Sequence, residues 1–151
     1  MMHIPPAHRP KGDGPRTIVT GVDGSPTSLR AAAYAAGLAR RQGARMVAVH
    51  VIRPPFGANM APMADIELRG TLKEIAEQVR DDVHDGAEHV GMQVEFVTAD
   101  GDPYAQLVRV TNQLGADALV VGASTRVGHR IVGSLAVRLV RSGLWPVTVV
   151  P

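Results

Sequence analysis

Glycine, serine and arginine are concentrated between Gly122 and Ser134, in the stretch Gly-Ala-Ser-Thr-Arg-Val-Gly-His-Arg-Ile-Val-Gly-Ser. Glycines allow a backbone to approach a ligand closely, and a helix starting at Gly133-Ser134 would present free N–H groups and the positive end of its dipole. Arg126, His129 and Arg130 make the stretch basic, and it contains no acid. The chemistry indicated is anion binding, with phosphate as the leading candidate.

Three other polar side chains are candidates for the same chemistry. Asp23 follows an apolar stretch, where a carboxylate could bind a ribose hydroxyl or hold Mg²⁺ through water. An Asp in this position fits a turn before a helix equally well. Ser124 and Thr125 could contact phosphate through their hydroxyls, although simple turn formation is the commoner role of such residues.

The chain offers no recognisable catalytic set or metal site. It contains no cysteine, which excludes thiol catalysis and thiolate metal sites. His84 and His89 are five residues apart, so they do not share one face of a helix. His50 falls inside an apolar strand and is interpreted as a structural residue. We therefore expect neither a defined enzyme activity nor a protein-bound metal.

Short apolar stretches alternate with helical ones along the chain. The predicted strands are 17–21, 45–52, 93–98, 117–121 and 146–150. The predicted helices are 29–41, opened by the cap Ser25 and by Pro26, then 65–90, 103–114 and 133–142. Prolines predict a loop over 53–64. The second helix is expected to bury a broken stripe that consists of Ile66, Leu72, Ile75, Val79 and Val83.

This alternation predicts an α/β fold with three layers, in which four helices cover an open sheet of five parallel strands. The expected strand order is 3-2-1-4-5, and the flavodoxin-like order 2-1-3-4-5 is the alternative. In the first order a ligand crevice lies at the carboxyl ends of strands 1 and 4. The segments 21–25 and 122–134 both begin there. The turn at 100–103, after an edge strand, is expected to lie away from this crevice.

Composition limits the class of protein. The 151 residues fit one domain, predicted over 15–151, behind a disordered tail over 1–14 that is rich in Pro, Gly and His. A net charge of +2 and only five aromatic residues argue against nucleic-acid binding. No apolar run approaches the roughly 20 residues of a membrane span, and no signal peptide is evident. A cytoplasmic location is expected.

The final strand predicts a partner. Residues 145–151 are almost entirely apolar, and strand 5 is an edge in the expected order. An exposed apolar edge must be covered, and the same strand of a second copy would cover it around a two-fold axis. We expect a homodimer through residues 145–151.

Several motifs, in order, resemble those of the universal stress protein family. They are 18–25 (IVTGVDGS), His50-Val51, 101–103 (GDP), 116–122 (ADALVVG), Gly133-Ser134 and 146–150 (PVTVV). The resemblance covers about residues 15–151. It implies the 3-2-1-4-5 sheet, dimerisation through the last strand and a stress-response role without a defined reaction. It also implies ATP with magnesium, or cyclic AMP, as candidate cofactors.

The family's nucleotide motif, G-x2-G-x9-G-[ST], matches this chain in part. Gly122 matches its first glycine, and Gly133-Ser134 matches its final pair. Thr125 stands where the middle glycine is expected, and the stretch from there to Gly133 is two residues short. By resemblance, Asp23 contacts ribose and metal, and Val51 flanks adenine.

Val22, Arg126 and Leu135 complete the predicted nucleotide-binding set. Arg126 and its basic neighbours are expected to replace some of the missing backbone donors by charge. The shortened loop is similar to that of a branch of the family not thought to bind ATP, although that branch tends to lose the Gly-Ser pair.

These observations favour a dimeric, non-enzymatic stress-response protein with a degenerate site and weak or no ATP binding. A nucleotide sensor for ATP or cyclic AMP, using the 122–134 loop, is the alternative hypothesis. Slow ATP hydrolysis or autophosphorylation is a third hypothesis, and it ranks last because no general base can be assigned.

Overall fold

Nine regular elements are present in the computed structural model, which describes residues 14–53, 61–124 and 132–151. The strands are β1 (Thr17–Gly21), β2 (Arg45–Ile52), β3 (Val94–Asp100), β4 (Ala118–Gly122) and β5 (Val147–Val150). The helices are α1 (Pro26–Gln42), α2 (Pro62–His89), α3 (Pro103–Gln113) and α4 (Ser134–Ser142). Strands and helices alternate along the whole chain, as predicted.

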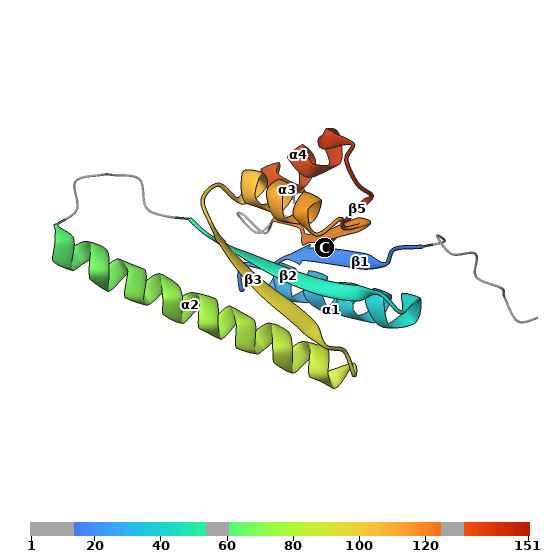
Figure 1. Cartoon of the computed structure of the whole chain (residues 1–151), viewed down its shortest axis with the longest axis horizontal. Helices are drawn as coiled ribbons and strands as arrows, with labels where there is room; N and C mark the ends of the chain where they lie inside the picture. Colours follow the sequence, from blue (N-terminus) through green and yellow to red (C-terminus); the bar gives the residue numbers. More distant parts are fainter. Residues whose placement is uncertain (1–13, 54–60, 125–131) are drawn as a thin grey trace, which may run out of the picture.

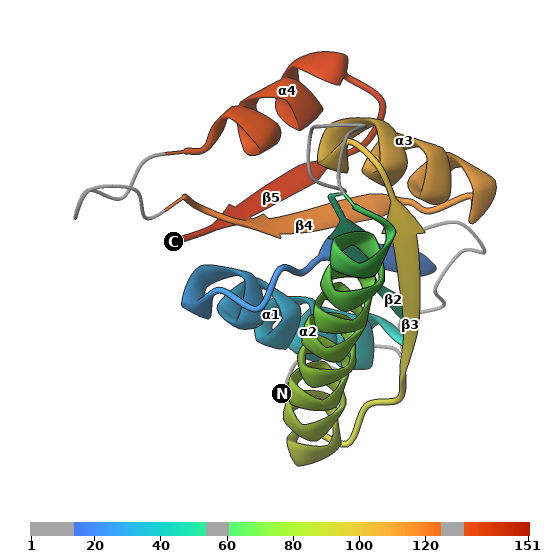
Figure 2. The same ribbon diagram turned by 90° about the vertical axis from the view of Figure 1, so that its left-hand side faces the viewer.

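The five strands form one parallel sheet in the order β3-β2-β1-β4-β5. This confirms the expected order and excludes the flavodoxin-like alternative. Helices α1 and α2 cover one face, and α3 and α4 cover the other (Figures 1 and 2). The fold is therefore the predicted three-layer arrangement, with β3 and β5 as its edges.

The central strands are apolar on both sides because helices cover both faces of the sheet. Neighbouring residues of β1 belong to different cores: Ile18 packs toward α1 and Val19 toward α3 and α4. In register, Ile18 lies beside Met46 of β2 and Ala118 of β4. Two hydrophobic cores thus sandwich the sheet, and its carboxyl edge is free to form a site.

Helix α1 begins and ends as its sequence predicts. The Ser25 hydroxyl accepts a hydrogen bond from the backbone N–H of Ser28 (3.2 Å), and Pro26 occupies the first turn. Gly43 ends the helix in the left-handed conformation (φ 65°). The buried face consists of alanines, which bring the helix close to the sheet.

Helix α2 differs from its prediction in two ways. It begins at Pro62 instead of residue 65, because proline needs no hydrogen-bond partner for its nitrogen in the first turn. Its buried residues are Ala76, Val79, Val83 and Ala87, all in the second half. Ile66 and Ile75, which the predicted stripe included, are 66% and 47% exposed. The first half of α2 therefore contributes little to the core.

The bounds of β1 and β2 match the predictions, and those of β3, β4, β5, α3 and α4 differ by at most two residues, with β3 running on to Asp100. Asp102 caps α3, since its Oδ2 accepts from the Ala105 N–H at 2.9 Å. Among the helices described, none combines the length and the apolar character needed to cross a bilayer.

Candidate functional site

A cavity of about 580 Å³ opens at the carboxyl ends of β1 and β4, where the sheet order reverses. We call it the crevice cavity. Its walls come from the turn between β1 and α1, the ends of β2 and β4, and the starts of α3 and α4. Its volume is within the range of sites for small molecules and cofactors.

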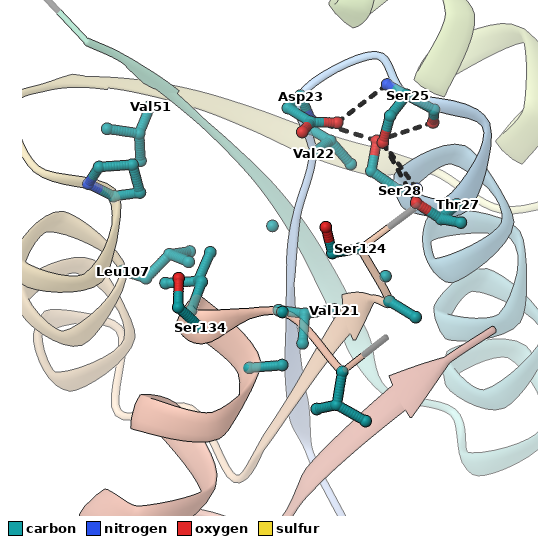
Figure 3. Close-up of a pocket in the computed structure, with 18 of the residues that line it drawn as sticks. Val22, Asp23, Ser25, Thr27, Ser28, Val51, Leu107, Val121, Ser124 and Ser134 are labelled. Carbon is teal, nitrogen blue, oxygen red and sulfur yellow. Dashed lines mark hydrogen bonds between the residues drawn. The ribbon is translucent and has the colours of Figure 1, made fainter. Parts of the chain in front are cut away.

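Seven of the nine residues predicted to bind a nucleotide line this cavity: Val22, Asp23, Val51, Gly122, Gly133, Ser134 and Leu135. They come from four separate segments of the chain, so the fold alone brings them together. The other two, Thr125 and Arg126, lie outside the described residues. Figure 3 shows the Asp23 turn, Val51 and Ser134 around the cavity.

The turn after β1 is held by a small network of polar groups. The Asp23 carboxylate accepts a hydrogen bond from the Ser25 N–H at 2.9 Å. The Ser28 hydroxyl donates to the Ser25 carbonyl (3.0 Å) and accepts from the Asp23 N–H (3.2 Å). Figure 3 draws these bonds beside the cavity. Asp23 thus forms the predicted turn and also lines the cavity, while its contact with a ribose hydroxyl or a metal ion stays a prediction.

The Asp23 carboxyl is stabilised in its charged form. Partial burial raises its pKa, but hydrogen bonds donated by the hydroxyl and N–H of Ser25 outweigh that effect, and Ser28 adds to them. The pKa is therefore held below its ordinary value of 3.8. At neutral pH the cavity presents a fixed carboxylate, suited to accept hydrogen bonds from hydroxyl groups.

Gly122 is required by packing, whatever the ligand. A Cβ added there would lie 2.6 Å from the carbonyl carbon of Thr27 and 2.8 Å from the nitrogen of Ser28. Both are backbone atoms of α1, which cannot move away as a flexible side chain would. The glycine therefore lets the start of α1 lie directly against the end of β4.

The start of α4 approaches the end of β4 in a similar way. A Cβ on Gly133 would lie 2.9 Å from the Cβ of Ser124, so the two ends of the intervening segment almost touch. Gly133 is the N-cap, and no side chain of the described residues caps this helix. Its first N–H groups are therefore available to a ligand or water. Ser134, also a cavity residue, is the first helical residue and not the cap.

The opposite wall of the cavity is apolar and includes residues that sequence reasoning missed. Leu107 and Pro103 of α3 lie there with Val22 and Val51. We expected the 100–103 turn to lie away from the crevice, and for Pro103 this is wrong. A chain leaving edge strand β3 for β4 must cross over β2 and β1, which carries the start of α3 over their carboxyl ends. That crossover was the available signal.

His50 of β2 is a buried residue that is hydrogen-bonded to Val22, a residue of the cavity wall. It is 6% exposed, and its Nδ1 donates to the Val22 carbonyl at 2.9 Å. Its ring stacks on Phe96, with the ring centroids 6.4 Å apart. The predicted structural role of His50 is confirmed. His84 and His89 lie on the exposed side of α2, also as predicted.

The charge and donors of the cavity suit a polar ligand with an apolar ring. Among the described lining residues, Asp23 is the charged one, and the hydroxyls of Ser25, Thr27, Ser28, Ser124 and Ser134 supply donors and acceptors. No group of three His, Asp or Glu side chains in the described ranges is placed to hold a metal ion. An open parallel α/β sheet with such a cavity at its switch point places the protein in the doubly wound α/β class, whose members bind ligands at this point.

Comparison with known proteins identifies the family. The model of the "Universal stress protein family" matches residues 14–151, and this chain belongs to that family of stress-response proteins. Universal stress protein MJ0531 of Methanocaldococcus jannaschii is 26% identical over 144 residues, which cover 89% of this chain and 81% of the relative.

Two solved structures show the same fold. A universal stress protein in complex with cAMP is 24% identical, with a TM-score of 0.70, over 91% of this chain and 97% of its own. The universal stress protein from Archaeoglobus fulgidus in complex with dAMP is 25% identical, with a TM-score of 0.57, over 89% of this chain and 97% of its own. Their sequences have diverged widely from this one while the architecture is retained.

Proposed function

We propose that this chain is a non-enzymatic stress-response protein whose crevice cavity holds a nucleotide with one phosphate group and binds ATP weakly or not at all. The binding of dAMP by the relative from Archaeoglobus fulgidus supports a nucleotide as the ligand. The apolar wall around Val51 and Leu107 suits a base, and the Asp23 carboxylate suits a ribose hydroxyl.

The close approach of Ser124 and Gly133 carries the proposal. Because a single Cβ on Gly133 would come within 2.9 Å of the Ser124 side chain, the segment between them starts and ends at nearly one point. The sequence there is two residues shorter than the family's nucleotide motif, which leaves fewer backbone donors for a triphosphate. One phosphate group at the uncapped start of α4 needs fewer donors than a triphosphate.

The absence of a general base among the described cavity residues supports a non-enzymatic role. Asp23 is the one carboxylate in this lining, and its lowered pKa makes it a weak base near neutral pH. ATP hydrolysis or autophosphorylation is therefore the third and least favoured hypothesis for the function. Incubation with labelled ATP tests this directly, because turnover or a phosphorylated protein would contradict a purely binding role.

Calorimetry with AMP, cyclic AMP and ATP with Mg²⁺ tests the proposed ligand. We expect ATP to bind with a Kd weaker than about 100 μM, roughly −5.5 kcal/mol, and AMP to bind more tightly, whereas tight binding of cyclic AMP would favour the sensor described below. Gly133→Val should abolish binding, because the new side chain collides with Ser124. ATP binding tighter than that threshold would overturn the proposal, and unchanged binding by a folded Gly133→Val protein would show that the site lies elsewhere.

A true ATP or cyclic AMP sensor is the second candidate function. It is favoured by the seven predicted binding residues that line one cavity, and by the Gly133-Ser134 pair at the start of α4. Protein purified from cells distinguishes the two functions. Co-purified ATP or cyclic AMP detected by mass spectrometry would favour the sensor, and co-purified AMP would favour the first proposal.

A homodimer through residues 145–151 is the assembly we propose, in keeping with the expected partner. All four residues of edge strand β5 are only half-buried, and beside it Leu144 and Val140 are 53% and 52% exposed. Pro146 and Val150 direct their carbonyls to β4, so Val147 and Val149 direct their backbone groups to the free edge. A second β5 would satisfy those groups.

Val149→Pro tests the dimer without removing the bonds between β5 and β4. Proline cannot donate at the free edge, so the protein should become monomeric in analytical ultracentrifugation at micromolar concentration. Circular dichroism checks that the variant is folded. A native protein that stays monomeric at this concentration, or a folded variant that stays dimeric, would contradict the proposal.

The remaining parts of the proposal concern the setting of the protein. We propose that 15–151 acts as one domain behind a tail over 1–14, that it works in the cytoplasm, and that it uses neither nucleic acid nor a membrane as partner. The small net charge of +2 supports the absence of a nucleic-acid partner.

A further inference from the structure

A second cavity, of about 620 Å³, lies on the face of the sheet that α2 covers and shares no lining residue with the crevice cavity. It opens between the first half of α2 and the carboxyl ends of β2 and β3, and we call it the α2 cavity. In both ribbon views α2 runs alongside β3 (Figures 1 and 2). Its floor is apolar and includes Ile52, Leu72, Ala76 and Phe96. The volume is that of a small-molecule site.

The first half of α2 leaves this space unfilled. Between Pro62 and Ile75 no residue of the helix is buried, whereas four are buried between Ala76 and His89. Leu68 and Leu72 face the cavity and are half-buried. Two apolar elements, the helix and the edge of the sheet, are thus held apart by a gap that an apolar ligand would fill.

Charges on α2 are sorted by their angle around the helix. At about 100° per residue, Arg69, Lys73 and Arg80 fall within an arc of about 40° that flanks the apolar stripe. These three side chains line the α2 cavity. Most of the acidic residues point away, on the exposed outer face: Glu67, Glu74, Asp81, Asp85 and Glu88. Of the charged α2 residues that line the cavity, three are basic and two, Asp65 and Glu77, are acidic.

Three acids also line the α2 cavity, and two of them are associated with one arginine. The Arg69 Nε lies 2.9 Å from the Asp65 carboxylate. Asp65 chiefly, and Asp100 from across the cavity, raise the pKa of Arg69. Glu77, the third acid, lies about 40° beyond Lys73, farther from the apolar stripe. A negatively charged ligand group in the cavity would therefore lie near Asp65 and Asp100, whose charges already interact with Arg69.

Lys73 is the cation left available to a ligand. Arg80 lies 3.6 Å from the Asp81 carboxylate, and Arg69 is paired with Asp65. In the part of the chain that the structure describes, Lys73 lies within 4.0 Å of no carboxylate, and it is the single lysine there. Its ammonium group stands beside an apolar floor that contains an aromatic ring, Phe96.

We propose that the α2 cavity binds a small amphipathic carboxylate, such as a medium-chain fatty acid. The apolar part lies between Leu72 and Phe96, and the carboxylate pairs with Lys73. Charge-assisted hydrogen bonding to the ammonium group fixes the head, and burial of the chain supplies most of the affinity. The ligand takes a surface of the sheet that the crevice cavity does not share.

Calorimetry with decanoate and with decan-1-ol, on the full chain, separates the two contributions. Decanoate should bind about tenfold more tightly than the alcohol, which lacks the charge. Lys73→Gln should reduce decanoate to the affinity of the alcohol, Lys73→Arg should restore most of the difference, and Arg41→Gln on α1 is the matched control of equal charge change. Equal affinity for acid and alcohol, or an unchanged Lys73→Gln protein, would overturn the proposal.

Protection of a lysine from acetylation locates the bound ligand without any substitution. The chain has two lysines, Lys11 and Lys73, so mass spectrometry follows each separately. Saturating decanoate should slow the acetylation of Lys73 and leave that of Lys11 unchanged. Equal rates with and without decanoate would overturn the proposal, and so would protection of Lys73 by anionic lipid vesicles with none by free decanoate, which would show a membrane surface as the partner.

Discussion

The crevice cavity lies at the carboxyl ends of the central strands and the α2 cavity beside edge strand β3, and the two are built in opposite ways. The crevice cavity is formed by backbone segments in direct contact: α1 against β4 at Gly122, and Ser124 against Gly133. The α2 cavity is formed by side chains of a helix whose first half buries nothing. A site made by close backbone approach depends on particular glycines, whereas a site made by spacing depends only on the character of a helix face.

The largest expected effect concerns the crevice cavity, where backbone segments are in close contact. Gly122→Ala places a Cβ 2.6–2.8 Å from backbone atoms of Thr27 and Ser28, so α1 or β4 must shift. We expect a loss of about 3 kcal/mol in the free energy of unfolding, measured by urea denaturation. The matched control is Gly86→Ala in α2, where the new methyl group meets nothing within 4 Å. A loss below 1 kcal/mol would show that the contact is not tight.

The cap of α1 provides the next test of the crevice cavity. Ser25→Ala removes the acceptor for the Ser28 N–H and should lower the free energy of unfolding by about 1 kcal/mol. It should also weaken ligand binding in the crevice cavity, because the Asp23 turn loses a partner. Thermal denaturation and calorimetry measure the two effects. Ser142→Ala, at the far end of α4, also loses hydroxyl hydrogen bonds but should leave ligand binding unchanged, and is the control for the second effect.

A substitution in the first half of α2, the helix that forms the α2 cavity, should change the free energy of unfolding in the opposite direction. Gly70 lies inside the first half of α2, and an added Cβ there would meet nothing within 4 Å. Gly70→Ala should raise the free energy of unfolding by about 1 kcal/mol, because alanine is the better helix former. Urea denaturation provides the measurement. A destabilised Gly70→Ala protein would mean that the first half of α2 is packed against something.

The smallest effect concerns the charge of Asp23. Because its pKa in the folded protein lies below 3.8, the ionised form stabilises the fold at higher pH, and this contribution is lost as the pH falls through the folded value. Native protein and Asp23→Asn should therefore differ in stability at about pH 6 and converge toward about pH 2. Asp85→Asn, on the exposed face of α2, is the control. A difference that does not vary with pH would contradict this account.

The contrast also explains what could be predicted from the sequence. The alternation of strands and helices, and the candidates Asp23, Gly122, Gly133 and Ser134, follow from local features of the chain: caps such as Ser25, prolines at helix starts, and glycines in loops. Local patterns left two strand orders open, and the resemblance to the universal stress protein family implied one of them and added Val51. Such residues have few alternative roles, and motif spacing identifies them. The predicted positions of β1, β2 and β4 needed no knowledge of distant contacts.

The errors have the opposite character. The place of Pro103 and Leu107 in the crevice depends on how α3 crosses the sheet, which no local pattern records. Ile66 looked like a core residue because it is apolar, yet the helix extends past the region that the sheet covers. The α2 cavity was not predicted at all, since it arises from the distance between a helix and an edge strand and not from any motif.

The contact at Gly122 has a mechanical consequence. The end of β4 has close contacts on two sides. The backbone of Thr27 packs against Gly122, and the Ala123 N–H donates a hydrogen bond to the Val150 carbonyl at 2.7 Å. The Pro151 carbonyl in turn accepts from Arg30 of α1 at 3.1 Å. Direct contacts therefore connect β4, β5 and the start of α1. We expect a ligand that displaces the crevice wall to shift edge strand β5 as well.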